Sequence, residues 1–259
     1  MTLPDPWSPA QYAQFAGERQ QPFRDLAALV RRRPGMRIVD LGCGDGEMTA
    51  WLHGELRAQE TVAIDNSEAM LTAAETRTVE GLIFRRADIA RFEPERSVDL
   101  IFSNAALQWL PDQETQLRRV ARFLAPGGQL AIQVPAMDEH PSHRIAFELG
   151  AEEPFTTAFD SWIWPRSTLP PERYLELLLE LGFVRPHVRM QLYPHSLPAA
   201  ESVVEWVKGT LLLTCRARMP ESLFERFVTE YRQRLLAELG EVRPYLYLYR
   251  RILVWGQRP

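Results

Sequence analysis

The stretch that decides the fold is Val39-Asp40-Leu41-Gly42-Cys43-Gly44-Asp45-Gly46, followed along the chain by Val62-Ala63-Ile64-Asp65. An apolar run, a glycine-rich turn, a helical segment and a second apolar run ending in an acid predict one β-α-β unit. The glycines permit a sharp turn and leave room for a ligand against the backbone. Because Asp65 ends the second strand, its carboxylate can accept hydrogen bonds from two ribose hydroxyls. The stretch therefore predicts a nucleotide-type binding site.

The spacing of the turn indicates which ligand it binds. A dinucleotide turn has the spacing G-x-G-x-x-G and seats a pyrophosphate at a helix N-terminus. Here the spacing is G-x-G-x-G, and Asp40 and Asp45 add two carboxylates that would repel a diphosphate. Ammonium and sulfonium charges suit such a site, so we predict S-adenosyl-L-methionine as the cofactor and S-adenosyl-L-homocysteine as its product. The run D-L-G-C-G-D-G resembles the first motif of class I methyltransferases; the alternative is an ordinary strand-turn-helix connection, which Asp65 disfavours.

Further along, apolar runs alternate with helical patterns, as in a doubly wound sheet. Strands are predicted at 37–41, 61–64, 82–86, 98–103, 129–134, 186–193 and 245–255, and helices at 20–32, 46–57, 112–124 and 171–181. The predicted fold class is α/β, with a mostly parallel, Rossmann-like, seven-stranded sheet in a single methyltransferase domain, 1–259. Residues 1–34 are expected to form N-terminal helices or a lid. Two helical insertions, 135–170 and 195–242, are expected to cover the active site.

The amino-acid composition of the chain limits the kinds of substrate and binding partner that we expect. The chain has 259 residues, a formal net charge of -4 and 25% charged residues. This acidic balance disfavours nucleic acid as a substrate. There is no apolar signal region and no run as long as a membrane helix. The two cysteines, Cys43 and Cys215, do not have the pattern of a disulfide-rich protein or the spacing of metal ligands. We expect a cytoplasmic protein that binds no nucleic acid, membrane or metal.

Residues after the predicted strands complete the candidate cofactor site. Ala87-Asp88-Ile89 resembles the adenine-binding position of this fold, where a carboxylate accepts from the adenine amino group. Ile89 and Met70 would then sandwich the ring; taken alone, Asp88 fits a turn or a helix cap. Asn104, after the fourth strand, can bond the methionine portion. The candidate cofactor-binding residues are Asp40, Gly42, Cys43, Gly44, Asp65, Asn66, Met70, Asp88, Ile89 and Asn104.

The stretch Asn104-Ala105-Ala106-Leu107-Gln108-Trp109-Leu110-Pro111-Asp112 lies where this fold places the substrate against the reactive methyl group. Gln108 and Trp109 are therefore candidates for catalytic positioning. Ordinary core packing is an equally good explanation of Trp109.

Several motifs together resemble the trans-aconitate 2-methyltransferase family over essentially the whole chain. They are Trp7, Tyr12, Phe15 and Glu18-Arg19, the cofactor motif, Asp65–Met70, Leu107–Asp112, Val203 with Glu205-Trp206-Val207, and Tyr249–Val254. The resemblance implies methyl transfer from S-adenosylmethionine to a carboxylate of trans-aconitate, giving a monomethyl ester. Segments 135–170 and 207–215 depart from the family pattern, and both lie where the substrate should be chosen.

Such a reaction sets simple physical requirements. A carboxylate has a reference pKa of about 4, so it is already an anion at neutral pH and needs no general base. The protein must instead align the reacting atoms and supply donors to a small anionic substrate. Arginine forks suit carboxylates best. The predicted substrate-binding residues are Trp7, Tyr12, Arg19 and Arg250, with Arg19 preferred; His140, His143, Arg144, Arg166 and Gln108 are further candidates. For most of these arginines a solvated surface position is the alternative.

Other functions remain open at this point. A malonyl-carrier-protein O-methyltransferase has a similar Gln-Trp stretch but needs a basic docking patch, and Arg31-Arg32-Arg33 is the one basic cluster. Another small-molecule methyltransferase is possible, and a non-enzymatic S-adenosylmethionine-binding protein is the alternative outside enzymes. Methylation of nucleic-acid bases is disfavoured by the charge and by the missing Pro-Pro-aromatic motif. We expect a monomer or a weak dimer.

Overall fold

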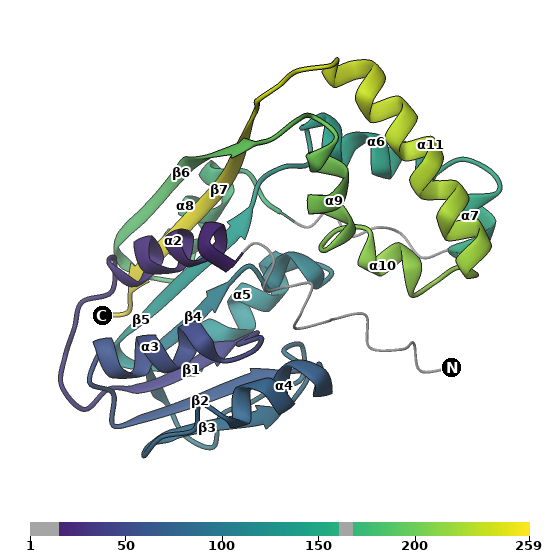
Figure 1. Cartoon of the computed structure of the whole chain (residues 1–259). Coiled ribbons are helices and arrows are strands. Elements are labelled where there is room, and N and C mark those ends of the chain that lie inside the picture. Colours follow the sequence, from purple (N-terminus) through teal and green to yellow (C-terminus); the bar gives the residue numbers. More distant parts are fainter. Residues whose placement is uncertain (1–15, 161–167) are drawn as a thin grey trace. The chain divides into compact units, whose positions relative to one another are not determined.

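The computed structural model describes residues 16–160 and 168–259 (Figure 1). In these residues seven strands form one sheet of order β3-β2-β1-β4-β5-β7-β6. The strands are β1 (Arg37–Leu41), β2 (Glu60–Asp65), β3 (Leu82–Arg86), β4 (Val98–Asn104), β5 (Leu124–Pro135), β6 (Val184–Leu197) and β7 (Tyr245–Gln257). Strands β1 to β5 pair in parallel, and β7 pairs antiparallel with β5. The predicted fold class is confirmed.

The helices of the described residues follow the predicted alternation as far as β5. They are α2 (Ala16–Ala27), α3 (Glu47–Glu55), α4 (Glu68–Glu75), α5 (Gln113–Ala121), α6 (Pro141–Gly150), α7 (Phe155–Ala158), α8 (Pro171–Glu180), α9 (Ser202–Lys208), α10 (Leu213–Arg216) and α11 (Glu221–Leu239), with a short 3-10 helix, η1, at Leu107–Trp109. Ser67 caps α4 through its hydroxyl, which accepts the N–H of Met70.

The chain divides into two compact units. The sheet unit contains the described residues 16–135, 168–191 and 251–259, and the helical unit contains 136–160 and 192–250. The helical unit has its own core, in which Trp206, Tyr231 and Tyr247 are almost completely buried among residues of α6, α9 and α11. The predicted role of residues 1–34, 135–170 and 195–242 as a covering lid stays a prediction.

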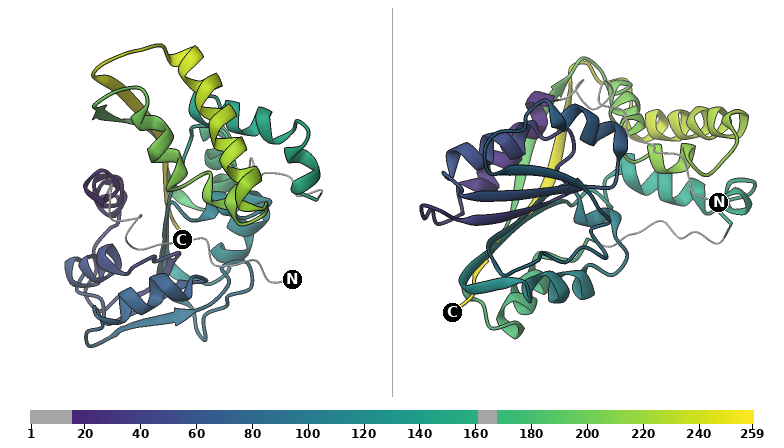
Figure 2. Two further views of the ribbon diagram at one scale, coloured as in Figure 1. Left: turned by 45° about the vertical axis from the view of Figure 1, so that its right-hand side comes forward. Right: turned by 90° about the horizontal axis from the view of Figure 1, so that it is seen from below.

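Within the sheet unit, helices cover both faces of the sheet. Viewed from below in Figure 2, the purple and blue helices α2, α3 and α4 lie on one side, and α5 and α8 lie on the other. The first face is built on an apolar core in which Phe23 and Leu26 of α2 pack with Leu52 of α3 and Phe102 of β4. We call this side the α2 face. The two-sided cover explains why β1 and β4 are buried along almost their whole length.

The bounds of α2, and the junction of α5 with β5, differ from the sequence prediction. Helix α2 begins at Ala16 and ends at Ala27, earlier than the predicted 20–32. Helix α5 ends at Ala121 and β5 begins at Leu124, so Pro126-Gly127-Gly128 lies inside the strand instead of ending the helix. The reason is an irregular register: Val98 pairs with Leu124 but Leu100 pairs with Gln129, so the extra residues bulge out of β5. The left-handed φ of +72° at Gly127 belongs to this bulge.

Candidate active site

The turn between β1 and α3 is held by hydrogen bonds to the next strand. The backbone N–H groups of Gly42 and Cys43 both donate to the carbonyl oxygen of Ile64, at 2.8 and 2.9 Å. Gly42, Gly44 and Gly46 have φ angles of +86°, +58° and +76°. These left-handed values explain why glycine stands at all three positions of the motif.

The three glycines differ in what surrounds them. A Cβ at Gly42 would lie 2.3 Å from the Cβ of Ala106, in the segment after β4, and a Cβ at Gly46 would lie 2.7 Å from the ring of Phe84. At Gly44 no atom lies within 4 Å of the position that a Cβ would take. Gly42 and Gly46 therefore allow close packing, whereas Gly44 leaves open space above the turn.

Asp65, at the end of β2, connects the turn to the start of α4. Its Oδ2 accepts the N–H of Gly44 and its Oδ1 accepts the N–H of Ser67, both at 2.9 Å. These bonds orient the carboxylate toward the turn. An ionised carboxylate can accept about four hydrogen bonds, so this group can serve backbone and ligand together.

Asp40, in β1, is only 1% exposed and accepts a hydrogen bond of 2.5 Å from the hydroxyl of Thr49 in α3. Burial raises the pKa of Asp40 to about 7, with a further increase from the negative charge of Asp65 and an opposing effect of the Thr49 bond. A nearby cation would favour the ionised form. Burial also raises the pKa of the Cys43 thiol well above its usual range, with help from Asp40, so this thiol stays protonated.

The strand register places five polar side chains on the α2 face, near the carboxyl ends of the parallel strands. Asp40 pairs with Ala63 and Phe102, so Asp65 and Asn104, two residues further along their strands, share its face. Asn104 pairs with Gln133, and Gln133 pairs with Leu253, two residues from Arg251. We call this set, in strand order, the polar row: Asp65, Asp40, Asn104, Gln133 and Arg251. It changes from acidic to basic across five neighbouring strands.

The middle of the polar row contains unsatisfied groups. Among the described residues, no hydrogen-bond partner lies near the buried Oδ1 of Asn104 or near Nε2 of Gln133, which is fully buried. Buried polar atoms without partners are uncommon and indicate a missing ligand or water. A ribose and an ammonium group require hydrogen-bond acceptors and space. These are provided by Oδ1 of Asn104, the Asp65 carboxylate and the open space above Gly44. These residues therefore fit the predicted S-adenosyl-L-methionine.

The candidate adenine residues lie near the same turn. Ile89 Cδ1 is 3.6 Å from where a Cβ of Gly42 would lie, and Met70 is buried at the start of α4. Asp88 is exposed, and its Oδ1 accepts the N–H of Ala90, which is the turn role that the sequence also allowed. Asn66 is exposed. The adenine role of these residues stays a prediction.

The segment after β4 is tightly folded. Ala105 has a left-handed φ of +53°, which is costly for a residue other than glycine. Its N–H donates to the carbonyl oxygen of Gln133, and its own carbonyl oxygen accepts Nε2 of Gln108 at 2.8 Å. Trp109 ends η1 and is half-buried. Strained backbone is common at functional sites, so this geometry agrees with a positioning role.

Most of the predicted substrate residues are not placed beside the polar row. Trp7, Tyr12 and Arg166 lie outside the described residues, and of Arg19 only its place in the first turn of α2 is described. Arg250 is exposed and belongs to the helical unit. Arg144 forms surface ion pairs with Glu148 and Glu238.

The two predicted histidines belong to a buried network in the helical unit. Nδ1 of His140 and Nδ1 of His143 lie 2.9 and 3.0 Å from the hydroxyl of Ser142, which also contacts the hydroxyl of Tyr247. Burial lowers the pKa of His140 to about 4 and of His143 to about 3. Both rings are therefore neutral near pH 7 and provide no cationic charge for an anion.

Gln133 and Arg251 were not predicted from the sequence. Arg251 was visible as half of an arginine pair, and the alternation along the last strand indicated that its two arginines face opposite ways. Which of them faces inward depends on the pairing of β7 with β5, which the sequence does not specify.

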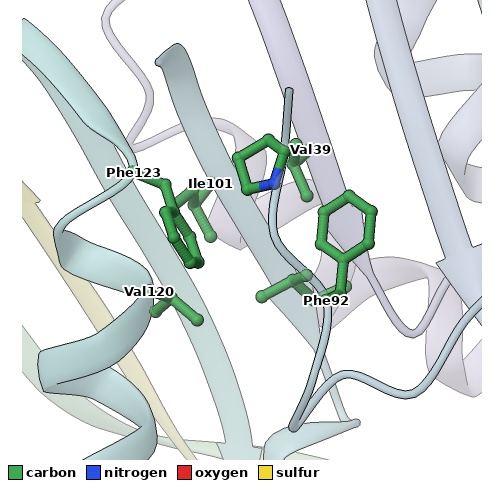
Figure 3. Close-up of a pocket in the computed structure, with 7 residues that line it drawn as sticks. Val39, Phe92, Ile101, Val120 and Phe123 are labelled. Carbon is green, nitrogen blue, oxygen red and sulfur yellow. The ribbon is translucent and has the colours of Figure 1, made fainter. Parts of the chain in front are cut away.

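The pocket of Figure 3 lies on the other side of the sheet. It has no room for a water molecule, and it is lined by Val39, Leu41, Phe92, Pro94, Ile101, Val120 and Phe123. Val39 and Ile101 alternate with the residues that face α2, so the pocket lies beneath α5. All seven lining residues are apolar, which gives a charged cofactor no polar partner. We attribute the pocket to loose packing of this core.

Within residues 16–160 and 168–259, no helix is both long enough and apolar enough to cross a bilayer. In the same ranges no three side chains from His, Cys, Asp and Glu gather closely enough to hold a metal ion.

Comparison with known proteins places the chain in a family. Residues 39–132 match the family model described as methyltransferase domain. The chain is 42% identical to the trans-aconitate 2-methyltransferase of Deinococcus radiodurans, over 98% of both chains. It is 38% identical to the enzyme of that name from Variovorax paradoxus, over 88% of both. The solved structure of the YcgJ protein of Bacillus subtilis superposes with a TM-score of 0.60 at 16% identity, covering 92% of this chain and 98% of that one. The chain therefore belongs to the trans-aconitate 2-methyltransferase family.

Proposed function

We propose that this protein is an S-adenosyl-L-methionine-dependent methyltransferase that esterifies a carboxylate of trans-aconitate, releasing the monomethyl ester and S-adenosyl-L-homocysteine. The observation that carries the proposal is the 42% identity to a trans-aconitate 2-methyltransferase over 98% of both chains. The polar row supports it independently, since it offers acceptors to a cationic cofactor at one end and donors to an acid at the other.

The bound cofactor would supply a methyl group on a positively charged sulfur, open to displacement by an anionic oxygen. The residues of the acidic end would hold it. Asp65 binds the ribose hydroxyls, Gly44 lets the ligand approach the backbone, and Oδ1 of Asn104 accepts from the ammonium group. The buried Asp40 provides negative charge near these positions. Met70, Asp88 and Ile89 are the proposed adenine contacts, with Asn66 and Cys43 as neighbours in the two turns.

The protein's contribution to the chemical step is positioning. The acceptor carboxylate is ionised at neutral pH, so no side chain has to remove a proton. Alignment of reacting atoms contributes about 7–11 kcal/mol in favourable intramolecular reactions. Gln108 and Trp109, in the strained segment after β4, are the proposed positioning residues. Trp7, Tyr12 and Arg19 are proposed to contact the substrate from the N-terminal segment.

The partner is a small anionic molecule. A monomeric or weakly dimeric state, the absence of nucleic-acid and membrane partners, and a cytoplasmic location stay predictions from the sequence. Sedimentation at several protein concentrations would test the first of them.

The proposed function is tested with labelled S-adenosyl-L-methionine and a panel of acceptors: trans-aconitate, cis-aconitate, citrate, isocitrate and malonyl carrier protein. We expect turnover of trans-aconitate at least about tenfold above any other acceptor. Preferred turnover of malonyl carrier protein would instead identify a malonyl-carrier-protein O-methyltransferase. Binding of the cofactor without turnover of any acceptor in the panel would contradict the proposed methyltransferase activity.

A further inference from the structure

The basic end of the polar row contains a buried cation. Arg251 is 5% exposed, at the antiparallel pairing of β7 with β5. A guanidinium keeps its proton in proteins, so burial leaves a full positive charge inside the sheet unit. Its Nη1 donates to Oε1 of Gln133 at 3.2 Å. This bond fixes the orientation of the Gln133 amide. Because Oε1 faces Arg251, the other polar atom of the amide, the donor Nε2, is presented beside the guanidinium.

Gln129, in the same strand and on the same face, shows how this fold satisfies a buried amide. Its Oε1 accepts from the N–H of Arg31 and from Nε1 of Trp255, and its Nε2 donates to the carbonyl oxygen of Arg31. Gln133 is equally buried, but among the described residues its Nε2 has no acceptor. Leaving a buried donor unsatisfied costs about 1–3 kcal/mol. The difference between the two glutamines indicates that Gln133 has a ligand-binding role.

The charge of the missing ligand follows from the donors. The guanidinium of Arg251 and the unsatisfied N–H of Gln133 lie side by side, and two neighbouring donors of this kind suit a carboxylate. The cofactor's cationic groups suit the opposite end of the row. If the proposed reaction is correct, trans-aconitate keeps two ionised carboxylates while the third becomes an ester. These two need fixed donors away from the acidic residues.

We propose that Arg251 and Gln133 bind a carboxylate of the acid substrate that is not methylated, and so determine the preference for a polycarboxylic acid. This inference rests on the proposed function and names the residues that recognise its substrate. Gln133 has two roles: it positions Arg251 through Oε1 and donates to the carboxylate through Nε2.

Two variants test the proposal with different risks to the fold. Arg251→Gln removes the charge. Gln133→Glu keeps the size of the side chain and places an internal carboxylate beside Arg251, where it competes with the substrate. We expect each to raise KM for trans-aconitate roughly 10- to 100-fold, from the loss of one or two charge-assisted bonds. Arg251→Lys should recover part of this loss because it restores the charge.

The controls separate recognition from structure. The Kd of S-adenosyl-L-methionine, measured by calorimetry, should change less than about threefold in these variants, since its proposed contacts are Asp65, Gly44 and Asn104 and do not include either substituted side chain. Arg85→Gln, an exposed arginine on β3 paired with Glu95, should match the wild type. Equal increases in the KM for the acid and the Kd of the cofactor would indicate a structural role and overturn the proposal. So would an unchanged KM in both variants, or a larger increase in Arg250→Gln than in Arg251→Gln.

A direct binding measurement distinguishes this inference from the proposed function. Titration of trans-aconitate into protein saturated with S-adenosyl-L-homocysteine reports the carboxylate site without turnover. Binding to the wild type and its loss in Arg251→Gln and Gln133→Glu would support the site even if methyl transfer fails. An absence of binding to the wild type would overturn both proposals.

Discussion

The two ends of the polar row are built in different ways. At the acidic end, Asp40 and Asp65 belong to one β-α-β unit, and backbone N–H groups or a hydroxyl already hold both carboxylates. At the basic end, Gln133 and Arg251 are far apart in sequence, and β7 must pair with β5 to bring them together. The acidic end is therefore a local motif, whereas the basic end is a product of tertiary structure. Variants that affect one end and spare the other test this division.

The largest effect is expected at the acidic end. Asp65→Ala should raise the Kd of S-adenosyl-L-methionine by roughly 100-fold or more, because two charge-assisted bonds to the ribose, worth about 1.5–3 kcal/mol each, are lost. Calorimetry with the unliganded protein measures this change directly. The Asp88→Ala variant should lose less than about tenfold, since that exposed side chain bonds its own turn. An unchanged Kd in Asp65→Ala would remove this residue from the cofactor site.

The glycines of the turn provide a matched pair. In Gly42→Ala the new Cβ would lie 2.3 Å from that of Ala106, whereas Gly44→Ala meets no atom within 4 Å. Both variants incur about 1–2 kcal/mol for a left-handed residue, and Gly42→Ala adds about 1–3 kcal/mol of overpacking. Urea unfolding should therefore show Gly42→Ala to be the less stable variant. If the two midpoints agree, the segment after β4 moves away at little cost, and the turn does not fix its position.

Asp40 should give the acidic end a distinctive pH dependence. Its folded pKa of about 7 lies above the usual value of 3.8, so the native state binds a proton that the unfolded state has lost between about pH 4 and pH 7. The contribution of this group to stability is thus fully present below about pH 4 and is lost as pH rises through 7. Asp40→Asn removes the group while keeping an acceptor for Thr49.

Urea unfolding of Asp40→Asn and the wild type at pH 5 and pH 8 measures this effect. The advantage of the variant should grow with pH by about 2–4 kcal/mol, from the size of the shift. A difference between the two proteins that is the same at both pH values would mean that Asp40 is ionised throughout, contrary to its burial.

The division between the two ends also explains what the sequence could predict. The spacing of Gly42 and Gly44 with Asp65 specified the turn, because the hydrogen bonds that Gly42, Gly44 and Asp65 make join residues of one β-α-β unit. The inward position of Arg251, and not of Arg250, follows only from the register of β7 against β5. The start of β5 was misplaced for a similar reason, since the bulge at Gly127 depends on pairing with β4. The chemistry of a local motif could be predicted from the sequence, whereas the pairing of distant strands could not.

The smallest expected effect links the cofactor to Asp40. A cationic ligand stabilises a nearby carboxylate, so binding should lower the pKa of Asp40 and release a proton when the pH is at or below about 7. The affinity for S-adenosyl-L-methionine should then rise by up to about tenfold, or about 1.4 kcal/mol, as the pH increases from 6 to 8. Calorimetry at pH 6 in two buffers of different ionisation enthalpy would count the released protons. Asp40→Asn should bind without this release. Equal proton release in the variant would assign the titration to another group, and the negative charge at this end of the row would come from Asp65 alone.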